Sequence, residues 1–461
     1  MKKVSLTIMA IISAFGISMA QPADSAAGKQ KPSVETTVTT DSLKEQVENV
    51  KGSVDGLNES YLETKATVGA LAKIKVSGYI QAQWNRGDTE GVVDATNKLV
   101  KDRFLIKRGR LKTTYDAGLA KYVLEIDVTQ DGVGLKDAYA QFTEPWLKAF
   151  SLTMGAQDRP FGYEVGYSSS MLESPERSKV IGTFFPKEKD IGAMLEFGME
   201  EGPVSWLNAK VGVFNGQTNI LNENDGYKDI IGRLGFSFPL RDAGLSIEGG
   251  FSGYVGKITT TDTSWRDTSS KAKIGYNYTM NGAMWQKNVD GSLNQMFDRQ
   301  YFGGDLQLTY ATPVIGGTCL KGEVIQGKQP GTAASSNYYA AANPSNTALY
   351  NRDALGYYFY FIQNIDPASL QLVFKYDMYD PNTKVAASDF TATSNLTAAD
   401  IAYQTFGFGL LWYVPWAPNI RCMLFYEIPQ NEKLTAPAAA LAKYKNDLTD
   451  NLFTGRIQVK F

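Results

Sequence analysis

The sequence of 461 residues contains no histidine and only two cysteines, Cys319 and Cys422. Without histidine, Ser-His-Asp and Cys-His catalytic arrangements and the common histidine-containing metal sites are excluded. After residue 20, no apolar run approaches the roughly twenty residues that a transmembrane helix needs. The sequence therefore predicts a protein that is not an enzyme, that needs no cofactor or metal, and that has no helical membrane anchor.

Residues 1–20 have the pattern of a secretory signal peptide. Lys2 and Lys3 form a basic start, the next residues are mostly apolar, and Ser18-Met19-Ala20 is a small-x-small cleavage site. The following residue is Gln21 and not cysteine, so attachment of a lipid is not indicated. Removal of this segment leaves 44 basic and 48 acidic side chains, a net charge near −4. This charge argues against a nucleic-acid partner.

Residues 21–40 are rich in Ser, Thr, Ala, Lys and Pro and are predicted to be a flexible lead-in. A helix is predicted over residues 41–72, because apolar residues recur alternately every four and three positions, as in a coiled coil. This seam consists of Leu43, Val47, Val50, Val54, Leu57, Tyr61, Thr64, Val68 and Leu71. Three glycines weaken a lone helix, so we expect a short trimeric coiled coil. The alternative is a single amphipathic helix packed against the mouth of the β-structure that follows.

From Lys73 onward the apolar period changes to two, which is typical of strands. Short and long connections take turns, and this is typical of transmembrane β-barrels. A soluble sandwich, the alternative, has turns of similar length at both ends. We therefore predict an all-β membrane protein, a 16-stranded antiparallel transmembrane β-barrel over residues 73–461. The strands are expected near 74–86, 103–115, 119–129, 134–143, 149–157, 189–199, 203–214, 228–238, 244–255, 298–311, 315–327, 354–364, 369–379, 401–414, 418–428 and 450–461.

The final strand, residues 451–461, resembles the closing strand of bacterial outer-membrane barrels. One face is apolar, and the other carries Thr454, Arg456, Gln458 and Lys460. The resemblance implies pairing with the first strand, 74–86, and recognition of the terminal Phe461 by the barrel-insertion machinery. The alternative is a half-buried strand of a soluble sandwich. Cys319 and Cys422 are expected on opposite faces of the wall and hence not in a disulfide.

A sixteen-stranded barrel encloses an aqueous channel, so its lumen-facing charges are the candidate functional residues. Arg108, Arg110 and Lys112 alternate on one strand and form a short basic ladder. Pairing with acids on neighbouring strands is the expected role of most lumen charges. We expect Arg108 and Arg110 to be exceptions, because only Asp102 is an acid near them on their strand face. The predicted continuation of the ladder consists of Arg233, Arg299, Lys321, Arg421 and Arg456.

Several segments, in their order along the chain, resemble the phosphate-selective porin O and P family in a form typical of Bacteroidetes-type envelopes. The resemblance covers about residues 74–461. The matching segments are Arg108 to Leu111, Leu135 to Tyr139, Met154 to Gln157, Pro160 to Gly162, Glu176-Arg177, Lys189 to Gly192, Phe214 to Gly216, Tyr379 to Thr383, Tyr426-Glu427 and Asn431 to Lys433.

This resemblance implies a homotrimeric porin of a Gram-negative outer membrane, in contact with lipid and with its N-terminal helix in the periplasm. The function that it implies is passive diffusion of small hydrophilic solutes, with or without a preference for anions such as phosphate. It also implies an inward-folded constriction loop at 157–188, with Arg159, Glu164, Glu176, Arg177 and Lys179 as candidate residues. The alternative is a structural protein that tethers the outer membrane to the cell wall through its coiled coil.

Overall fold

The computed structural model describes residues 40–88, 102–217, 226–259, 277–288, 296–338 and 348–461. The predicted signal peptide (1–20) and almost all of the lead-in (21–40) lie outside the described residues. The chain divides into two units, Met1–Val68 and Gly69–Phe461, which are described separately.

The first unit contains all but the last three residues of helix α1, Thr40–Leu71, which confirms the helix predicted over 41–72. Its seam side chains are exposed, from 49% for Leu43 to 72% for Leu57. The helix therefore presents an apolar stripe that its own unit does not cover. In the part of the chain that the structure describes, no helix combines the length and the apolar character needed to cross a membrane.

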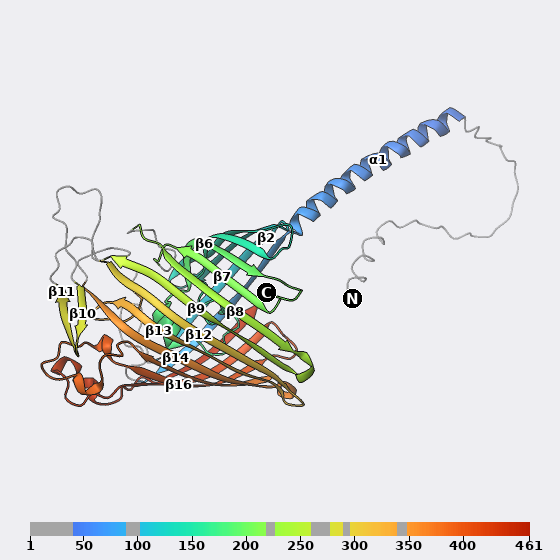
Figure 1. The fold of residues 1–461 in the computed structure, drawn as a ribbon. Coiled ribbons are helices and arrows are strands. Elements are labelled where there is room, and N and C mark those ends of the chain that lie inside the picture. The colour runs from blue at the N-terminus through green and yellow to red at the C-terminus, as the bar shows by residue number, and fades with distance from the viewer. Residues whose placement is uncertain (1–39, 89–101, 218–225, 260–276, 289–295, 339–347) are drawn as a thin grey trace. The chain divides into compact units, whose positions relative to one another are not determined.

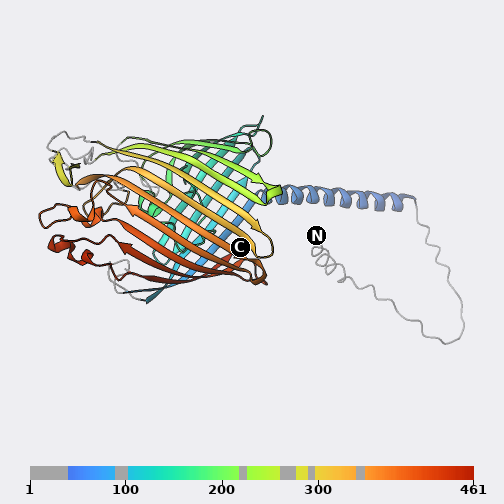
Figure 2. The same cartoon turned by 60° about the horizontal axis from the view of Figure 1, so that its bottom comes forward.

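The second unit is a closed antiparallel barrel of sixteen strands, as predicted (Figure 1). Each strand pairs with its neighbours in sequence, and β18 pairs with β1 to close the wall. Figure 2 shows the strands tilted across this wall. They are β1 (Ile74–Gly87), β2 (Asp102–Asp116), β3 (Ala120–Thr129), β4 (Gly132–Thr143), β5 (Phe150–Asp158), β6 (Lys189–Gly198), β7 (Leu207–Phe214), β8 (Asp229–Leu240), β9 (Leu245–Thr259), β12 (Met296–Thr312), β13 (Gly316–Gly331), β14 (Leu349–Ile365), β15 (Leu370–Asp380), β16 (Tyr403–Tyr413), β17 (Ile420–Asn431) and β18 (Leu452–Lys460).

The two faces of the wall follow the sequence alternation. In β18, Arg456 is 3% exposed and faces the lumen, whereas its neighbour Ile457 is 54% exposed and faces outward. The predicted pairing of this strand with β1 is confirmed, with Trp84 opposite Gly455. Leucine, valine and phenylalanine side chains are exposed around the outside of the barrel. An apolar outer face around a polar interior is the pattern of a barrel that lies in lipid.

Short connections lie at one end of the barrel and longer ones at the other. The turn end includes the 3₁₀ turns η1 (Arg241–Ala243) and η2 (Asp366–Ala368). The loop end includes η3 (Ala387–Asp389), η4 (Ala398–Asp400) and η5 (Ala439–Lys445), and the hairpin of β10 (Asn277–Asn281) and β11 (Met284–Asn288). One connection at the loop end is short, the two-residue turn between β3 and β4. Strands β9, β13 and β14 extend four or five residues beyond their predicted ends. Ladder pairing continues to Gly331 opposite Tyr350 between β13 and β14, and to Thr259 of β9 opposite Met296 of β12.

Cys319 and Cys422 are free and lie on opposite faces of the wall. Cys319 packs against the interior hydrophobic cluster. Cys422 is paired with the outward-facing Ile457. Their predicted orientation is therefore confirmed.

Candidate functional site

The loop between β5 and β6, residues 159–188, contacts several sides of the barrel wall. Gly162 N donates to Ser252 Oγ of β9 (2.8 Å), and Gln458 Nε2 of β18 donates to Ser170 O (3.1 Å). Tyr360 of β14 donates its hydroxyl hydrogen to Glu164 Oε1 (3.2 Å). Because β9, β14 and β18 are separated around the barrel, these contacts place the loop across the lumen.

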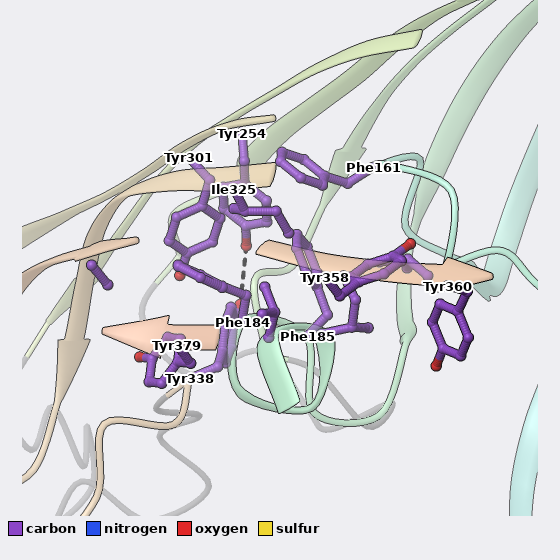
Figure 3. Close-up of a cluster of buried hydrophobic side chains, with 14 of the residues drawn as sticks. Phe161, Phe184, Phe185, Tyr254, Tyr301, Ile325, Tyr338, Tyr358, Tyr360 and Tyr379 are labelled. Atoms are coloured by element: carbon purple, nitrogen blue, oxygen red, sulfur yellow. Dashed lines mark hydrogen bonds between the residues drawn. The ribbon is translucent and has the colours of Figure 1, made fainter. Parts of the chain in front are cut away.

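Aromatic side chains pack one end of this loop against the wall. Phe184 and Phe185 lie 4.9 Å and 5.9 Å, between ring centroids, from Tyr301 of β12 (Figure 3). Helix α2 (Lys179–Phe184) holds Phe184 and begins after Ser178, whose hydroxyl accepts from Ile181 N (3.2 Å). This packing buries the aromatic side chains of the loop and fixes the side of the lumen that the loop fills.

Two buried carboxylates fix the first turns of the loop. Glu323 Oε2 of β13 accepts from the backbone N–H groups of Tyr163 and Glu164 and from the Tyr358 hydroxyl (3.2, 3.4 and 2.9 Å). Glu164 Oε2 in turn accepts from the N–H and the hydroxyl of Ser178 (2.9 and 2.8 Å). A buried acceptor that keeps its donors avoids the cost of an unsatisfied polar group. These acids therefore position the loop, and they are already supplied with donors.

The centre of the loop carries Glu176, Arg177 and Glu188. Burial acts to raise the pKa of Glu188, but the Arg177 guanidinium, a backbone hydrogen bond, Lys136 and Arg108 together lower this pKa to about 2. Burial also acts against ionisation of Glu176, but Arg108, Lys107 and Arg456 together hold its pKa well below the usual range. Both carboxylates are therefore charged at neutral pH. Arg177 also donates to the backbone oxygens of Glu164 (2.8 Å) and Tyr167 (2.6 Å), so it braces the loop from within.

The predicted ladder shares the lumen face of β2 and consists of Arg108, Arg110 and Lys112. Each of these cations forms an ion pair with an acidic side chain. Arg110 pairs with Glu125 (2.6 Å) and Asp127 (3.0 Å) of β3. Arg108 pairs with Glu176 (2.8 Å), and Lys112 with Asp137 (3.3 Å). The expectation that Arg108 and Arg110 lack acidic partners is therefore wrong, because the partners come from the neighbouring strand and from the loop.

The other predicted lumen cations have different surroundings. Arg233 forms two hydrogen bonds with Asp305 (2.7 and 3.2 Å). Arg299 is 1% exposed and pairs with Asp229 (3.0 Å) at the loop end. Lys321 pairs with Glu173 of the loop (2.6 Å).

Four further predicted cations remain, two on the wall and two in the loop. Arg421 and Arg456 donate to the backbone oxygens of Met171 (3.5 Å) and Pro175 (2.7 Å). Arg159 is enclosed between the rings of Phe185 and Tyr338, 4.8 and 5.1 Å from their centroids. Lys179 is exposed and lies over the Tyr403 ring. Most of these cations thus hold the loop in place.

Three adjoining cavities lie in the lumen beside the loop. The loop-side cavity (about 340 Å³) and the middle cavity (about 370 Å³) share Arg110, Arg177 and Glu188 in their linings. The middle cavity shares Lys112 and Asp137, among others, with the turn-side cavity (about 550 Å³). The shared side chains place the three spaces next to one another, and the middle cavity, lined by Ser77 and Lys460, also reaches the turn end. The lining of the loop-side cavity holds six basic and three acidic side chains. The lining of the middle cavity holds five basic and four acidic side chains, and that of the turn-side cavity holds four of each.

Two lumen lysines were missed by sequence reasoning, because β-bulges place them there. In β2, Arg108 pairs with Gln81 and Ile106 with Ala82, so Lys107 is the extra residue. In β4, Lys136 is the extra residue in the same way, between Asp137 and Leu135. Both lysines line the loop-side cavity. Strict alternation assigns Lys107 to the outer face, and nothing in the sequence marks the bulge.

No family model and no curated protein sequence matches the chain. Among solved structures, the chain is similar to the outer-membrane channel DcaP of Acinetobacter baumannii, with 12% identity over 84% of this chain and 97% of that chain and a TM-score of 0.47. It is also similar to an anion-selective porin from Comamonas acidovorans, with 11% identity over 84% of this chain and 99% of that chain and a TM-score of 0.45. A third similar structure is Salmonella typhi OmpF in complex with daunomycin, with 11% identity over 84% of this chain and 97% of that chain and a TM-score of 0.49. Such distant likenesses indicate no function, and the resemblance to the phosphate-selective porin O and P family stays a prediction.

Proposed function

We propose that the chain forms an outer-membrane channel through which small hydrophilic solutes diffuse passively. The observation that carries this proposal is the set of adjoining cavities with charged linings beside the loop at 159–188, inside a closed barrel. A wall with an apolar outer face and a charged inner face suits a pore through lipid. The loop sets the size of the solutes, since it fills part of the lumen.

A preference for anions is part of the proposal. Rings and rows of one charge sign are the physical basis of selectivity in pores. The loop-side cavity has twice as many basic as acidic side chains, including Arg108 and Arg110, whereas the other two cavities are nearly balanced. Anions are therefore concentrated at the loop-side entrance. Phosphate, as implied by the family resemblance, is one such anion.

The test is conductance of the purified full-length protein in planar lipid bilayers. Stepwise, ion-permeable increments of current are expected, with a reversal potential in a KCl gradient that favours chloride. Swelling of liposomes in a series of uncharged sugars then measures the size limit. Protein that is folded, by its heat-modifiable mobility in gels, and gives no current steps would contradict the proposal.

Assembly as a homotrimer through α1 is a second element of the proposal. The exposed seam of this helix is what favours it, because a helix with an uncovered apolar stripe is better stabilised by partners than alone. A periplasmic location of α1 and insertion of the barrel through recognition of Phe461 complete the proposal. A tether to the cell wall is compatible with the same helix and does not replace the channel.

A further inference from the structure

An apolar groove lies on the outer face of the wall, across β12, β13 and the strands beside them. Its volume is about 590 Å³, which is within the range of sites that bind small molecules. Two glycines of this face, Gly304 of β12 and Gly322 of β13, lie in the groove between the exposed side chains of Phe251, Val324 and Phe359. A glycine inside a strand often marks a place where a ligand or another chain approaches the backbone closely.

The surface of this groove is suited to a hydrocarbon chain. Leu306 and Tyr357 complete its outward-facing walls, and both are exposed. The charged side chains of the same strands point the other way. Asp305, for example, pairs with Arg233 in the lumen (2.7 Å). A ligand in the groove therefore meets aromatic and aliphatic side chains and the backbone.

Toward the loop end, the same outer face becomes polar. Lys257 of β9 and Lys328 of β13 are exposed and lie on strands that are two apart, so about 10 Å separates them across the wall. Gln300 of β12 lies opposite Lys328. On β12, Gln300 precedes Gly304 by four residues, or about 13 Å. A charged level about 13 Å above an apolar groove matches the order of head group and acyl chain in a lipid.

This polar edge carries groups of both charge signs. Asp298 lies opposite Lys257, and Asp353 lies opposite Lys328. Lys384 pairs with Asp353 (2.6 Å), whereas neither Lys257 nor Lys328 forms an ion pair among the described residues. Ammonium groups bind phosphate oxygens, and carboxylates accept hydrogen bonds from hydroxyl groups. A phosphorylated sugar supplies both kinds of partner.

We infer that this outer face binds a phosphorylated glycolipid of the lipid A type. One acyl chain lies in the groove at Gly304 and Gly322, and the phosphorylated sugar lies at Lys257 and Lys328. This inference goes beyond the proposed channel, because the lipid binds outside the lumen. It rests only on the location of the barrel in a membrane.

The experiment is native mass spectrometry of the full-length protein in detergent, with monophosphoryl lipid A added. Phosphatidic acid is the comparison, since it offers a phosphate without sugar hydroxyls, and it is expected to bind only at higher concentrations. Gly304→Leu is expected to weaken the binding of lipid A about tenfold, because the leucine displaces about two methylene groups from the groove. A Cβ atom at Gly304 lies 3.8 Å from Phe251 Cδ1, an ordinary contact, so the wall accepts a side chain there.

Gly455→Leu is the matched control for this variant. Gly455 also faces outward, on β18, and a Cβ atom there lies 3.6 Å from Trp84 Cε3. Because Gly455 is not part of the groove, lipid A should bind to this variant as it does to the wild type.

A second pair of variants tests the polar edge. Lys257→Gln with Lys328→Gln is expected to weaken the binding of lipid A about thirtyfold and to make it less sensitive to salt. Lys257→Arg with Lys328→Arg keeps both charges and should keep the affinity. Lys433→Gln with Lys443→Gln removes two exposed lysines elsewhere at the loop end and should leave the affinity unchanged.

A folded and conducting protein that binds no lipid A overturns this inference and leaves the channel intact. The inference is also wrong if Gly304→Leu and Gly455→Leu bind lipid A equally well, or if phosphatidic acid binds as tightly as lipid A. If Gly304→Leu changes the ratio of trimer to monomer in the same spectra and not the bound lipid, the groove is a contact between copies of the chain and the lipid site is refuted.

Discussion

Arg108 and Arg110 are held by acids, and this changes how their charge acts. Arg110 is matched by Glu125 and Asp127, so its field is largely local. Arg108 shares Glu176 with two other cations, so positive charge remains around it. In the proposed channel, selectivity would therefore depend on the balance of a cluster and not on a free arginine. Removal of one of these cations leaves its acidic partners without a counter-charge, and this changes the net charge of the cluster.

A double variant tests this balance. Arg108→Ala with Arg110→Ala leaves Glu125, Asp127 and Glu176 with fewer cations, so the reversal potential in a KCl gradient should shift toward potassium. The control is Lys384→Ala with Lys443→Ala, which removes two exposed lysines from the loop end. This control variant should leave the reversal potential unchanged. An unaltered reversal potential in the arginine variant would remove these residues from the selectivity of the channel.

The Arg177–Glu188 pair makes the loop resistant to mild acid. Because the pKa of Glu188 is lowered to about 2 in the folded protein, its stabilising contribution is fully present above its ordinary pKa near 4.5 and is lost progressively as the pH falls from there through 2. Single-channel current noise in the wild type should therefore be the same at neutral pH and at about pH 4. Glu188→Gln lacks the charge at every pH and should be noisier already at neutral pH. A wild-type channel that becomes noisy well above the ordinary carboxylate range would contradict this assignment.

At the scale of elements, α2 depends on a glycine of the opposite wall. A Cβ atom at Gly356 of β14 would lie 2.7 Å from Val180 Cγ1, closer than carbon atoms approach. Gly356→Ala should therefore push α2 away from the wall and destabilise the folded protein by about 1–3 kcal/mol, as overpacking does. The expected result is a lower heat-denaturation temperature, read from gel mobility, together with a noisier current.

Gly134→Ala is the control for this variant. Gly134 is also a strand glycine, but a Cβ atom there meets nothing within 4 Å. If Gly356→Ala and Gly134→Ala have the same heat-denaturation temperature and the same current noise, α2 does not pack against the wall at Gly356.

Strands and loop differ in how far sequence predicts them. All sixteen strands can be predicted from the alternation of polar and apolar residues, because each strand turns one face to the lumen and the other outward. A shift of one residue in a strand would exchange these two faces. The bulges at Lys107 and Lys136 do not follow, because alternation says nothing of a skipped residue. The partners of Arg108 and Arg110 were also missed, since they come from a neighbouring strand and from a loop more than sixty residues away in sequence.

Across the whole barrel, basic side chains gather beside the loop. The excess of basic over acidic side chains in the described linings is three in the loop-side cavity, one in the middle cavity and zero in the turn-side cavity. The last two cavities both reach the turn end, since Lys460 lines the middle cavity and Trp206 lines the turn-side cavity. In the proposed channel, a preference for anions would therefore arise beside the loop at 159–188 and not at the turn end.

Helix α1 is the element through which several copies of the chain would act as one molecule. In a trimer its seam is buried, and each leucine contributes roughly 1.5–3 kcal/mol on burial. Leu57→Lys places a charge in that seam and should lower the temperature at which the trimer dissociates, measured by gel mobility after heating. Asn58→Lys adds the same charge beside the seam and should leave that temperature unchanged. If both variants dissociate like the wild type, α1 does not pack against its copies, and the barrel walls alone hold any trimer together.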